Sequence, residues 1–142
     1  MDFVIGRAMD SDSREVPVAA AVVRNGEIIS SATNAVESYG IPWNHAEFLA
    51  ISDALKKLNS RYLDDSSIYI TLEPCAFCAA LLEKVRIKDI FFGAYDPKCG
   101  AIAHNIKLFE SSLIKPNIIG GIQEERCSIL LKNFFNNLRT QK

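Results

Sequence analysis

Three side chains of the kind that bind zinc stand in two short motifs of the sequence. The tripeptide H-A-E begins at His45, and the pentapeptide P-C-A-F-C contains Cys75 and Cys78. The two cysteines are three residues apart, so at a helix start both sulfurs point from one side of the first turn. The free N–H groups and positive potential there favour thiolates. Because thiolates and imidazoles are tetrahedral zinc ligands, the motifs predict a zinc site.

Three protein ligands leave one tetrahedral position open, which is typical of catalytic zinc. Water bound at such a position has a pKa lowered toward about 7 and supplies a hydroxide nucleophile. Glu47 follows His45 by two residues, is not needed as a ligand, and can carry protons between that water and a substrate. We therefore expect one Zn²⁺ per chain, with a water or hydroxide as fourth ligand. One carboxylate and one metal hydroxide suffice for hydrolytic deamination.

Each motif also has a simpler interpretation. Asn44 followed by Glu47 matches a capping box, which would make Glu47 a helix cap. The C-x-x-C pair could be a redox pair, and His45 could be a surface residue at a helix start. A closed structural zinc site would take its fourth ligand from Cys99, Cys127 or His104.

The elements that must position these residues follow from the apolar spacing. Helices are predicted over residues 2–9, 45–58, 75–85 and 124–138. Strands are predicted over residues 18–23, 28–29, 67–72, 90–92 and 117–119. The Asn25-Gly26 pair indicates a hairpin between the first two strands. Loops are expected over residues 34–44 and 94–105.

The alternation of helices and strands after residue 45 indicates parallel strands joined by crossing helices. Together with the hairpin, it predicts an α/β fold in which a mixed sheet of about five strands has helices on both faces. Residues 1–142 are expected to form a single domain. The last predicted helix has an apolar stripe, and we expect Cys127 to lie in the core because it belongs to this stripe. The stripe consists of Cys127, Leu130, Leu131, Phe134 and Phe135.

The composition fits this fold class. The chain has 142 residues, of which 49% are hydrophobic and 23% are charged, which excludes a disordered, collagen-like or coiled-coil protein. It has no run of about 18 apolar residues, as a membrane helix would need, and its start does not resemble a secretory signal. We therefore expect a cytoplasmic protein without a membrane partner and without disulfides.

The net charge of −1 hides an asymmetry along the chain. Residues 1–83 contain 6 Lys+Arg against 12 Asp+Glu, whereas residues 84–142 contain 10 against 5. The basic second part can face phosphate groups, or it can be a solvated surface with uneven charge.

The two motifs together resemble the H-x-E…P-C-x-x-C signature of the zinc-dependent cytidine deaminase superfamily. Further blocks resemble the bacterial tRNA-specific adenosine deaminases and cover nearly the whole chain. They are E-V-P-V from Glu15, Asn34 ahead of the first motif, T-L-E-P-C from Thr71, F-G-A-Y-D-P-K-C-G-A from Phe92, and F-F…R ending at Arg139.

The resemblance implies a three-layer deaminase fold and a role for each matching residue. His45, Cys75 and Cys78 would hold zinc, and Glu47 would be the catalytic proton shuttle. Asn34 would hydrogen-bond the base, and Asp96 and Lys98 would lie near the nucleic-acid strand. The backbone near Ala46 and at residues 72–73 would line the pocket. The substrate-binding residues implied in this way are Asn34, Ala46, Leu72, Glu73, Asp96 and Lys98. The last helix would help to grip a tRNA anticodon stem-loop, and Lys98, Arg126 and Arg139 stand in blocks that resemble tRNA-binding ones. The protein would be a homodimer with its sites near the interface.

Three positions depart from the family pattern and concern the substrate rather than the zinc. Trp43-Asn44 stands where the family usually has Thr-Ala, and Trp43 either stacks on a base or packs in the dimer interface. Tyr95 replaces a frequent Arg, and Cys99 replaces a frequent Thr.

The expected activity is conversion of adenosine to inosine at the wobble position of tRNA. The reacting base must leave its stack, which a stem-loop with splayed bases makes easy. The alternative is a free-base guanine or cytosine deaminase, which needs no basic groove. A non-enzymatic, zinc-stabilised binding module is a third class, and the presence of Glu47 argues against it.

Overall fold

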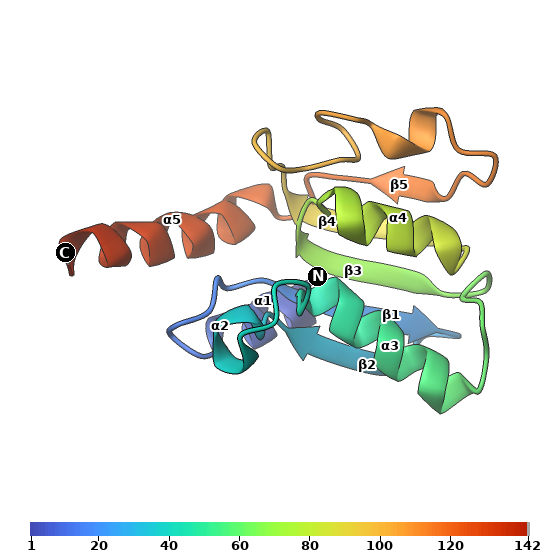
Figure 1. Cartoon of the computed structure of the whole chain (residues 1–142), viewed down its shortest axis with the longest axis horizontal. Helices are drawn as coiled ribbons and strands as arrows, with labels where there is room; N and C mark the ends of the chain where they lie inside the picture. The colour runs from blue at the N-terminus through green and yellow to red at the C-terminus, as the bar shows by residue number, and fades with distance from the viewer. Residues whose placement is uncertain (142) are drawn as a thin grey trace.

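A computed structural model describes residues 1–141, in which helices pack on both faces of one sheet (Figure 1). The helices are α1 (Asp2–Met9), α2 (Val36–Tyr39), α3 (Ala46–Leu58), α4 (Ala76–Lys84), α5 (Glu124–Thr140) and the 3₁₀ helix η1 (Leu108–Glu110). The strands are β1 (Ala19–Arg24), β2 (Glu27–Thr33), β3 (Ser67–Leu72), β4 (Asp89–Ala94) and β5 (Asn117–Ile119).

The sheet is mixed, with the strand order β2-β1-β3-β4-β5. Strand β1 is antiparallel to both β2 and β3, whereas β3, β4 and β5 are parallel. Asn25 and Gly26 both have positive φ, 51° and 75°, as a two-residue hairpin turn requires. The predicted five-stranded mixed sheet is thereby confirmed.

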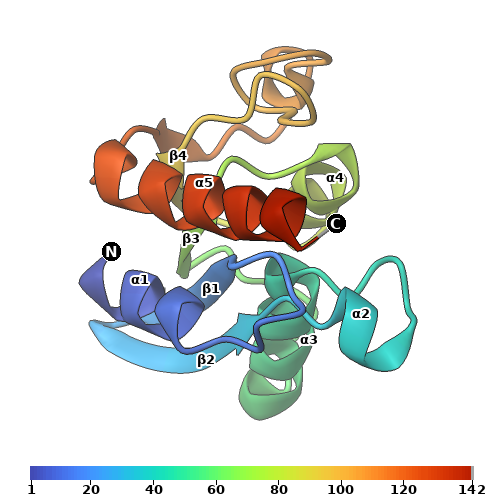
Figure 2. The same cartoon turned by 90° about the vertical axis from the view of Figure 1, so that its left-hand side faces the viewer.

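The alternation of side chains along β3 explains why both faces are covered. Ile68 and Ile70 are fully buried in the larger core cluster, which also contains Ile51 of α3 and Leu82 of α4. Tyr69 points to the opposite face and packs against the cluster made with α1. Figure 2 shows α3 and α4 on one side of the sheet, α1 on the other, and α5 passing across the end of the sheet.

The structure corrects two details of the predicted elements. The predicted loop over residues 34–44 contains helix α2, which ends at Gly40 in the left-handed region. Four residues are too few to show an apolar period. Helix η1 was not predicted either. The apolar stripe of the last helix is only partly buried: Cys127 is 1% exposed but Phe135 is 44% exposed, because α5 extends beyond the sheet (Figure 1).

Within residues 1–141, none of the helices has both the length and the apolar character needed to cross a membrane.

Candidate active site

The two motifs lie at the starts of two neighbouring helices. His45 is the N-cap of α3 and Cys75 is the N-cap of α4, and both have extended backbones with φ of −72° and −71°. A helix begins directly after each of these residues, so the two side chains lie beside the first turns of α3 and α4. Cys78 lies in the first turn of α4 and is buried.

The three predicted ligands converge with a spacing that fits zinc. The Nδ1 atom of His45 lies 3.6 Å from the Sγ atom of Cys75 and 3.5 Å from that of Cys78. All three ligand atoms lie within 4.8 Å of one another. A tetrahedral zinc with ordinary Zn–S and Zn–N bond lengths places N and S about 3.6 Å apart. The donor set and its spacing therefore fit a zinc ion.

The alternative closed zinc site, in which Cys99, Cys127 or His104 is the fourth protein ligand, does not form in the structure. Within residues 1–141, His45, Cys75 and Cys78 are the only cluster of at least three His, Cys, Asp or Glu side chains close enough to share an ion. Cys127 is buried in the α1–α5 cluster together with Ile5 and Ala94. The Nδ1 atom of His104 lies within hydrogen-bond distance, 2.8 Å, of the Oε1 atom of Glu73, and Cys99 is exposed.

A pocket of about 620 Å³ is lined by two of the predicted ligands, His45 and Cys75, whereas Cys78 is fully buried and does not line it. The predicted site residues that line it are Asn34, His45, Glu47, Leu72, Glu73, Cys75, Asp96 and Lys98. Ala46 is fully buried, and its N–H donates to the Oδ1 atom of Asn34 at 2.9 Å instead of facing the pocket. Tyr95 and Cys99, which depart from the family pattern, also line the pocket.

Comparison with known proteins decides the family. Residues 1–94 match the cytidine and deoxycytidylate deaminase zinc-binding region. The chain belongs to this deaminase family. The tRNA-specific adenosine deaminase of Rickettsia felis is 42% identical over 132 residues, which cover 90% of this chain and 92% of that protein.

Two solved structures of deaminases differ in how closely they match. One comes from studies of A-to-I editing by tRNA:A34 deaminases at the wobble position of transfer RNA. It has a TM-score of 0.88 and 30% identity, covering 92% of this chain and 97% of that one. The guanine deaminase of Bacillus subtilis has a TM-score of 0.61 and 31% identity, covering 66% of this chain and 64% of that one. This deaminase therefore shares more of its fold with the tRNA:A34 deaminase structure than with the guanine deaminase of Bacillus subtilis.

Hydrogen bonding among the three predicted ligands of the deaminase shifts their pKa values in different directions. Hydrogen bonds from Cys78 and His45 lower the pKa of Cys75 to about 4. The hydrogen bond to Cys75, together with burial, raises the pKa of Cys78, and the Cys75 hydrogen bond raises the pKa of His45. Cys75 is therefore the more readily ionised of the two thiols, whereas Cys78 and His45 hold their protons more strongly. A zinc ion replaces such protons when it binds.

Glu47 lies in the first turn of α3, beside the predicted ligands. It is 4% exposed, and this burial raises the pKa of its carboxyl group above the usual value. A carboxylate whose pKa is raised is a stronger proton acceptor than an ordinary glutamate. The capping-box interpretation is wrong, because His45 is the N-cap and no side chain of the capping pair closes the helix end.

Helix α5 forms the outer wall of the pocket. It contributes Leu131, Phe135 and Arg139 to the lining, and the first two belong to the predicted apolar stripe of this helix. Arg139 lies in the last turn of α5, where the resemblance placed a tRNA contact. Arg126, also on α5, instead forms an ion pair with Asp2 of α1 at 2.7 Å.

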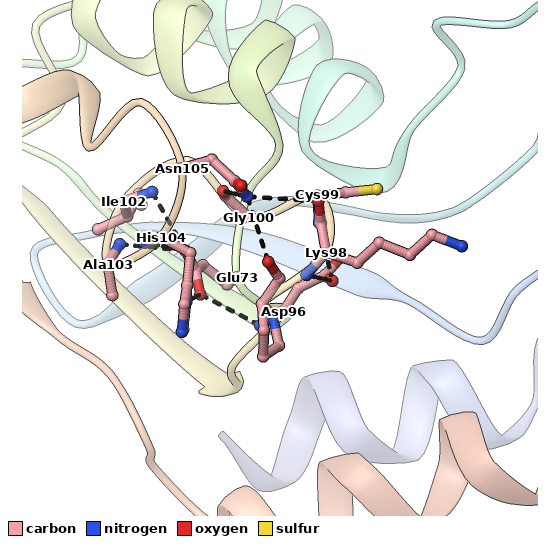
Figure 3. Close-up of polar contacts among 10 residues, drawn as sticks. Glu73, Asp96, Lys98, Cys99, Gly100, Ile102, Ala103, His104 and Asn105 are labelled. Carbon is pink, nitrogen blue, oxygen red and sulfur yellow. Dashed lines mark hydrogen bonds and ion pairs between the residues drawn. The ribbon is translucent and has the colours of Figure 1, made fainter.

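The side chain of Glu73 has a structural role that the sequence did not indicate. It is fully buried and receives hydrogen bonds from the segment that follows β4 (Figure 3). Burial raises the pKa of Glu73, but hydrogen bonds from His104 and from the N–H groups of Asp96, Ala103 and Ile102 hold it below its usual value. These donors lie 23 to 31 residues away in the chain, so no local pattern reveals them.

Proposed function

We propose that this deaminase converts adenosine to inosine at the wobble position of tRNA by zinc-dependent hydrolysis. The observation that carries the proposal is that the ligand cluster opens into a pocket with Lys98 and Arg139 in its outer wall. A free guanine or cytosine has no phosphate for these cations to bind, whereas an RNA strand has one at every nucleotide. The relative from Rickettsia felis carries the same activity in its name.

His45, Cys75 and Cys78 would hold one zinc ion in each chain. When bound, zinc supplies a Lewis acid that lowers the pKa of a water at the open fourth position toward about 7. The carboxylate of Glu47 accepts a proton from the attacking water and returns it to the adenine ring. Water adds to the carbon that carries the exocyclic amine, and Glu47 passes the second proton of that water to the amine. The C–N bond then breaks, so that ammonia leaves and inosine forms.

Asn34 is proposed to bind the base, and its hydrogen bonding supports this role. Its Oδ1 atom accepts from the N–H of Ala46 at 2.9 Å, which fixes the orientation of the amide. Among the described residues, the structure gives the Nδ2 group no partner, so it can donate to a ring nitrogen or oxygen. Ala46 therefore acts by orienting Asn34, while the backbone of Leu72 and Glu73 lines the pocket.

The proposed partner is the anticodon stem-loop. Its unpaired loop lets a base turn out of the stack at small cost. Asp96 and Lys98 would lie along the strand, with Tyr95 beside them in the pocket wall. We propose that the enzyme acts on tRNA in the cytoplasm.

A homodimer is part of the proposal. Trp43 and Phe77 are 53% and 47% exposed, and the ring of Phe77 lies 6.4 Å from that of His45. A second copy that covers these rings would lie next to the zinc site. Sedimentation or light scattering of the purified protein should give twice the mass of one chain, and a monomer at micromolar concentration would rule out this part.

One assay tests the function. The purified, zinc-loaded protein is incubated in parallel with an anticodon stem-loop that has adenosine at the wobble position, with free guanine and with free cytosine. A stem-loop with guanosine at the wobble position is the matched control. We expect inosine only from the adenosine stem-loop. Turnover of guanine or cytosine, with no inosine in the RNA, would establish the free-base alternative.

A further inference from the structure

Glu73 gathers five hydrogen-bond donors around one buried carboxylate (Figure 3). Its Oε1 atom accepts from the N–H of Asp96 at 3.1 Å and lies 2.8 Å from Nδ1 of His104. Its Oε2 atom accepts from the N–H groups of Ile102, Ala103 and His104 at 3.2, 3.0 and 3.3 Å. Both ends of the 96–104 segment are therefore tied to one side chain.

The segment tied in this way forms part of the pocket mouth. Asp96, Lys98 and Cys99 all line the pocket, and the carboxylate of Asp96 accepts from the N–H groups of Lys98 and Cys99 at 3.2 and 3.1 Å. Gly100 lies directly against the Glu73 carboxylate, so close that an added Cβ atom would collide with it. The position of Lys98 thus depends on a turn that rests on Glu73.

The same carboxylate also reaches Tyr95 through an aromatic contact. The His104 ring, held by Glu73, lies 6.0 Å from the Tyr95 ring in an edge-to-face arrangement. Phe92 meets Tyr95 in a similar arrangement at 5.1 Å. Tyr95 is 39% exposed and lines the pocket, so its exposed part is presented to whatever enters the mouth.

We propose that Glu73 is a positioning residue for the RNA strand: its carboxylate holds Lys98 and Tyr95 at the pocket mouth, where they bind the nucleotides beside the reacting adenosine. This inference rests on the proposed function. Without the carboxylate, the turn must become ordered when RNA binds, and the cost of that ordering weakens binding.

The zinc ligands are held mainly by the starts of two helices. Cys75 is the N-cap of α4 and Cys78 lies in its first turn, although Cys75 also pairs with Gly100 of the tied segment in a β-bridge. His45 is positioned by the start of α3. A change at Glu73 should therefore alter RNA binding much more than the chemical step.

Glu73→Gln tests the inference because the amide keeps the shape of the side chain but loses its charge and one acceptor oxygen. The probe is a fluorescently labelled anticodon stem-loop, whose Kd is measured by anisotropy at several salt concentrations. We expect Kd and KM to rise about 10-fold, as for the loss of hydrogen bonds to a charged group. We expect kcat to stay within about twofold and the salt slope to fall by about 0.7, since one single-strand phosphate contact is lost.

Two further variants keep the inference testable even if Glu73→Gln does not fold. His104→Ala removes one donor and the ring against Tyr95 at a partly exposed position, and should raise Kd about threefold. Ile106→Ala is the control, because Ile106 is 61% exposed two residues further along the chain, and it should leave Kd unchanged. Hydrogen exchange should speed up at the amides of Asp96 and Ala103 in Glu73→Gln.

The possible results separate the two proposals. Kd and KM that stay unchanged in Glu73→Gln and His104→Ala, with an active wild type, overturn the inference alone. A fall in kcat and zinc content at constant Kd also overturns it, because Glu73 would then serve the metal site. A wild type that neither binds nor deaminates the stem-loop overturns the proposed function, and the inference with it.

Discussion

The inner end and the mouth of the pocket are built in different ways. At the inner end, His45, Cys75 and Glu47 lie at the starts of α3 and α4, two helices packed on the sheet. At the mouth, Lys98 comes from a turn and Arg139 from the part of α5 that extends beyond the sheet. The chemistry thus depends on rigid elements, whereas the contacts with a large substrate depend on exposed segments.

The match to the deaminase zinc-binding region covers the inner end of the pocket and stops before most of the mouth. The match to the deaminase family ends at residue 94, so it includes all three ligands and Glu47. Tyr95, Asp96, Lys98 and helix α5 all lie beyond it. Changes at the inner end should abolish reaction on any substrate, and changes at the mouth should affect RNA binding.

The largest effect is expected from removal of a zinc ligand. Cys75→Ala should lose the metal and all measurable turnover, because two ligands cannot hold zinc tightly. Cys127→Ala is the matched control, since Cys127 is buried in the α1–α5 cluster away from the ligands. Elemental analysis should find about one zinc per chain in the wild type and in Cys127→Ala. Loss of zinc from Cys127→Ala would show that the ligand set is wrong.

Glu47→Gln should lower kcat by about 10²- to 10⁴-fold and leave the zinc content unchanged. The amide keeps the shape of the side chain but cannot accept a proton from water. Single-turnover kinetics on the stem-loop, with elemental analysis of the same sample, give both quantities. Normal turnover by the variant would remove Glu47 from the mechanism and leave it a purely structural role.

At the mouth, Lys98→Ala and Arg139→Ala should weaken RNA binding while kcat changes little. Each lost single-strand phosphate contact should lower the slope of log Kd against log salt by about 0.7. Arg126→Ala is the charge-matched control, because Arg126 pairs with Asp2 instead of lining the pocket. Melting temperatures of all three variants show whether α5 is still in place. Equal effects in all three variants would mean that net charge, and not the pocket mouth, governs binding.

The smallest expected effect is on folding stability and concerns the hydrogen bond between Ala46 and Asn34, apart from the role of Asn34 in binding the base. Asn34→Ala removes the acceptor for the N–H of Ala46 at the start of α3 and should lower the free energy of unfolding by about 1 kcal/mol. Asn34→Asp keeps an acceptor there and should retain most of that stability. Urea denaturation of the two variants measures the difference. Equal stabilities would show that the hydrogen bond to Ala46 contributes nothing.

The inner end could be predicted almost completely from the sequence, and the mouth only in part. The spacing of Cys75 and Cys78, and the position of His45 at a helix start, are local patterns, and the structure brings these residues together. The strands were predictable for a similar reason, because alternation along β3 reflects the burial of its two faces.

The part that could not be predicted depends on contacts between distant segments. The link between Glu73 and His104 spans 31 residues and has no period or motif. Phe135 belongs to the same apolar stripe of α5 as the buried Cys127, but it is 44% exposed and lines the pocket. A binding wall and a core face have the same apolar spacing, so only the position of α5 relative to the sheet tells them apart.

The most direct test of the account is the reaction of the zinc-loaded protein with an anticodon stem-loop in isotopically labelled water. The account predicts that adenosine at the wobble position becomes inosine, and that mass spectrometry finds one labelled oxygen on the carbon that carried the amine. Glu47→Gln with its zinc retained should give almost no labelled product. Unchanged adenosine in the presence of active, zinc-loaded protein, or inosine without the label, would contradict the account.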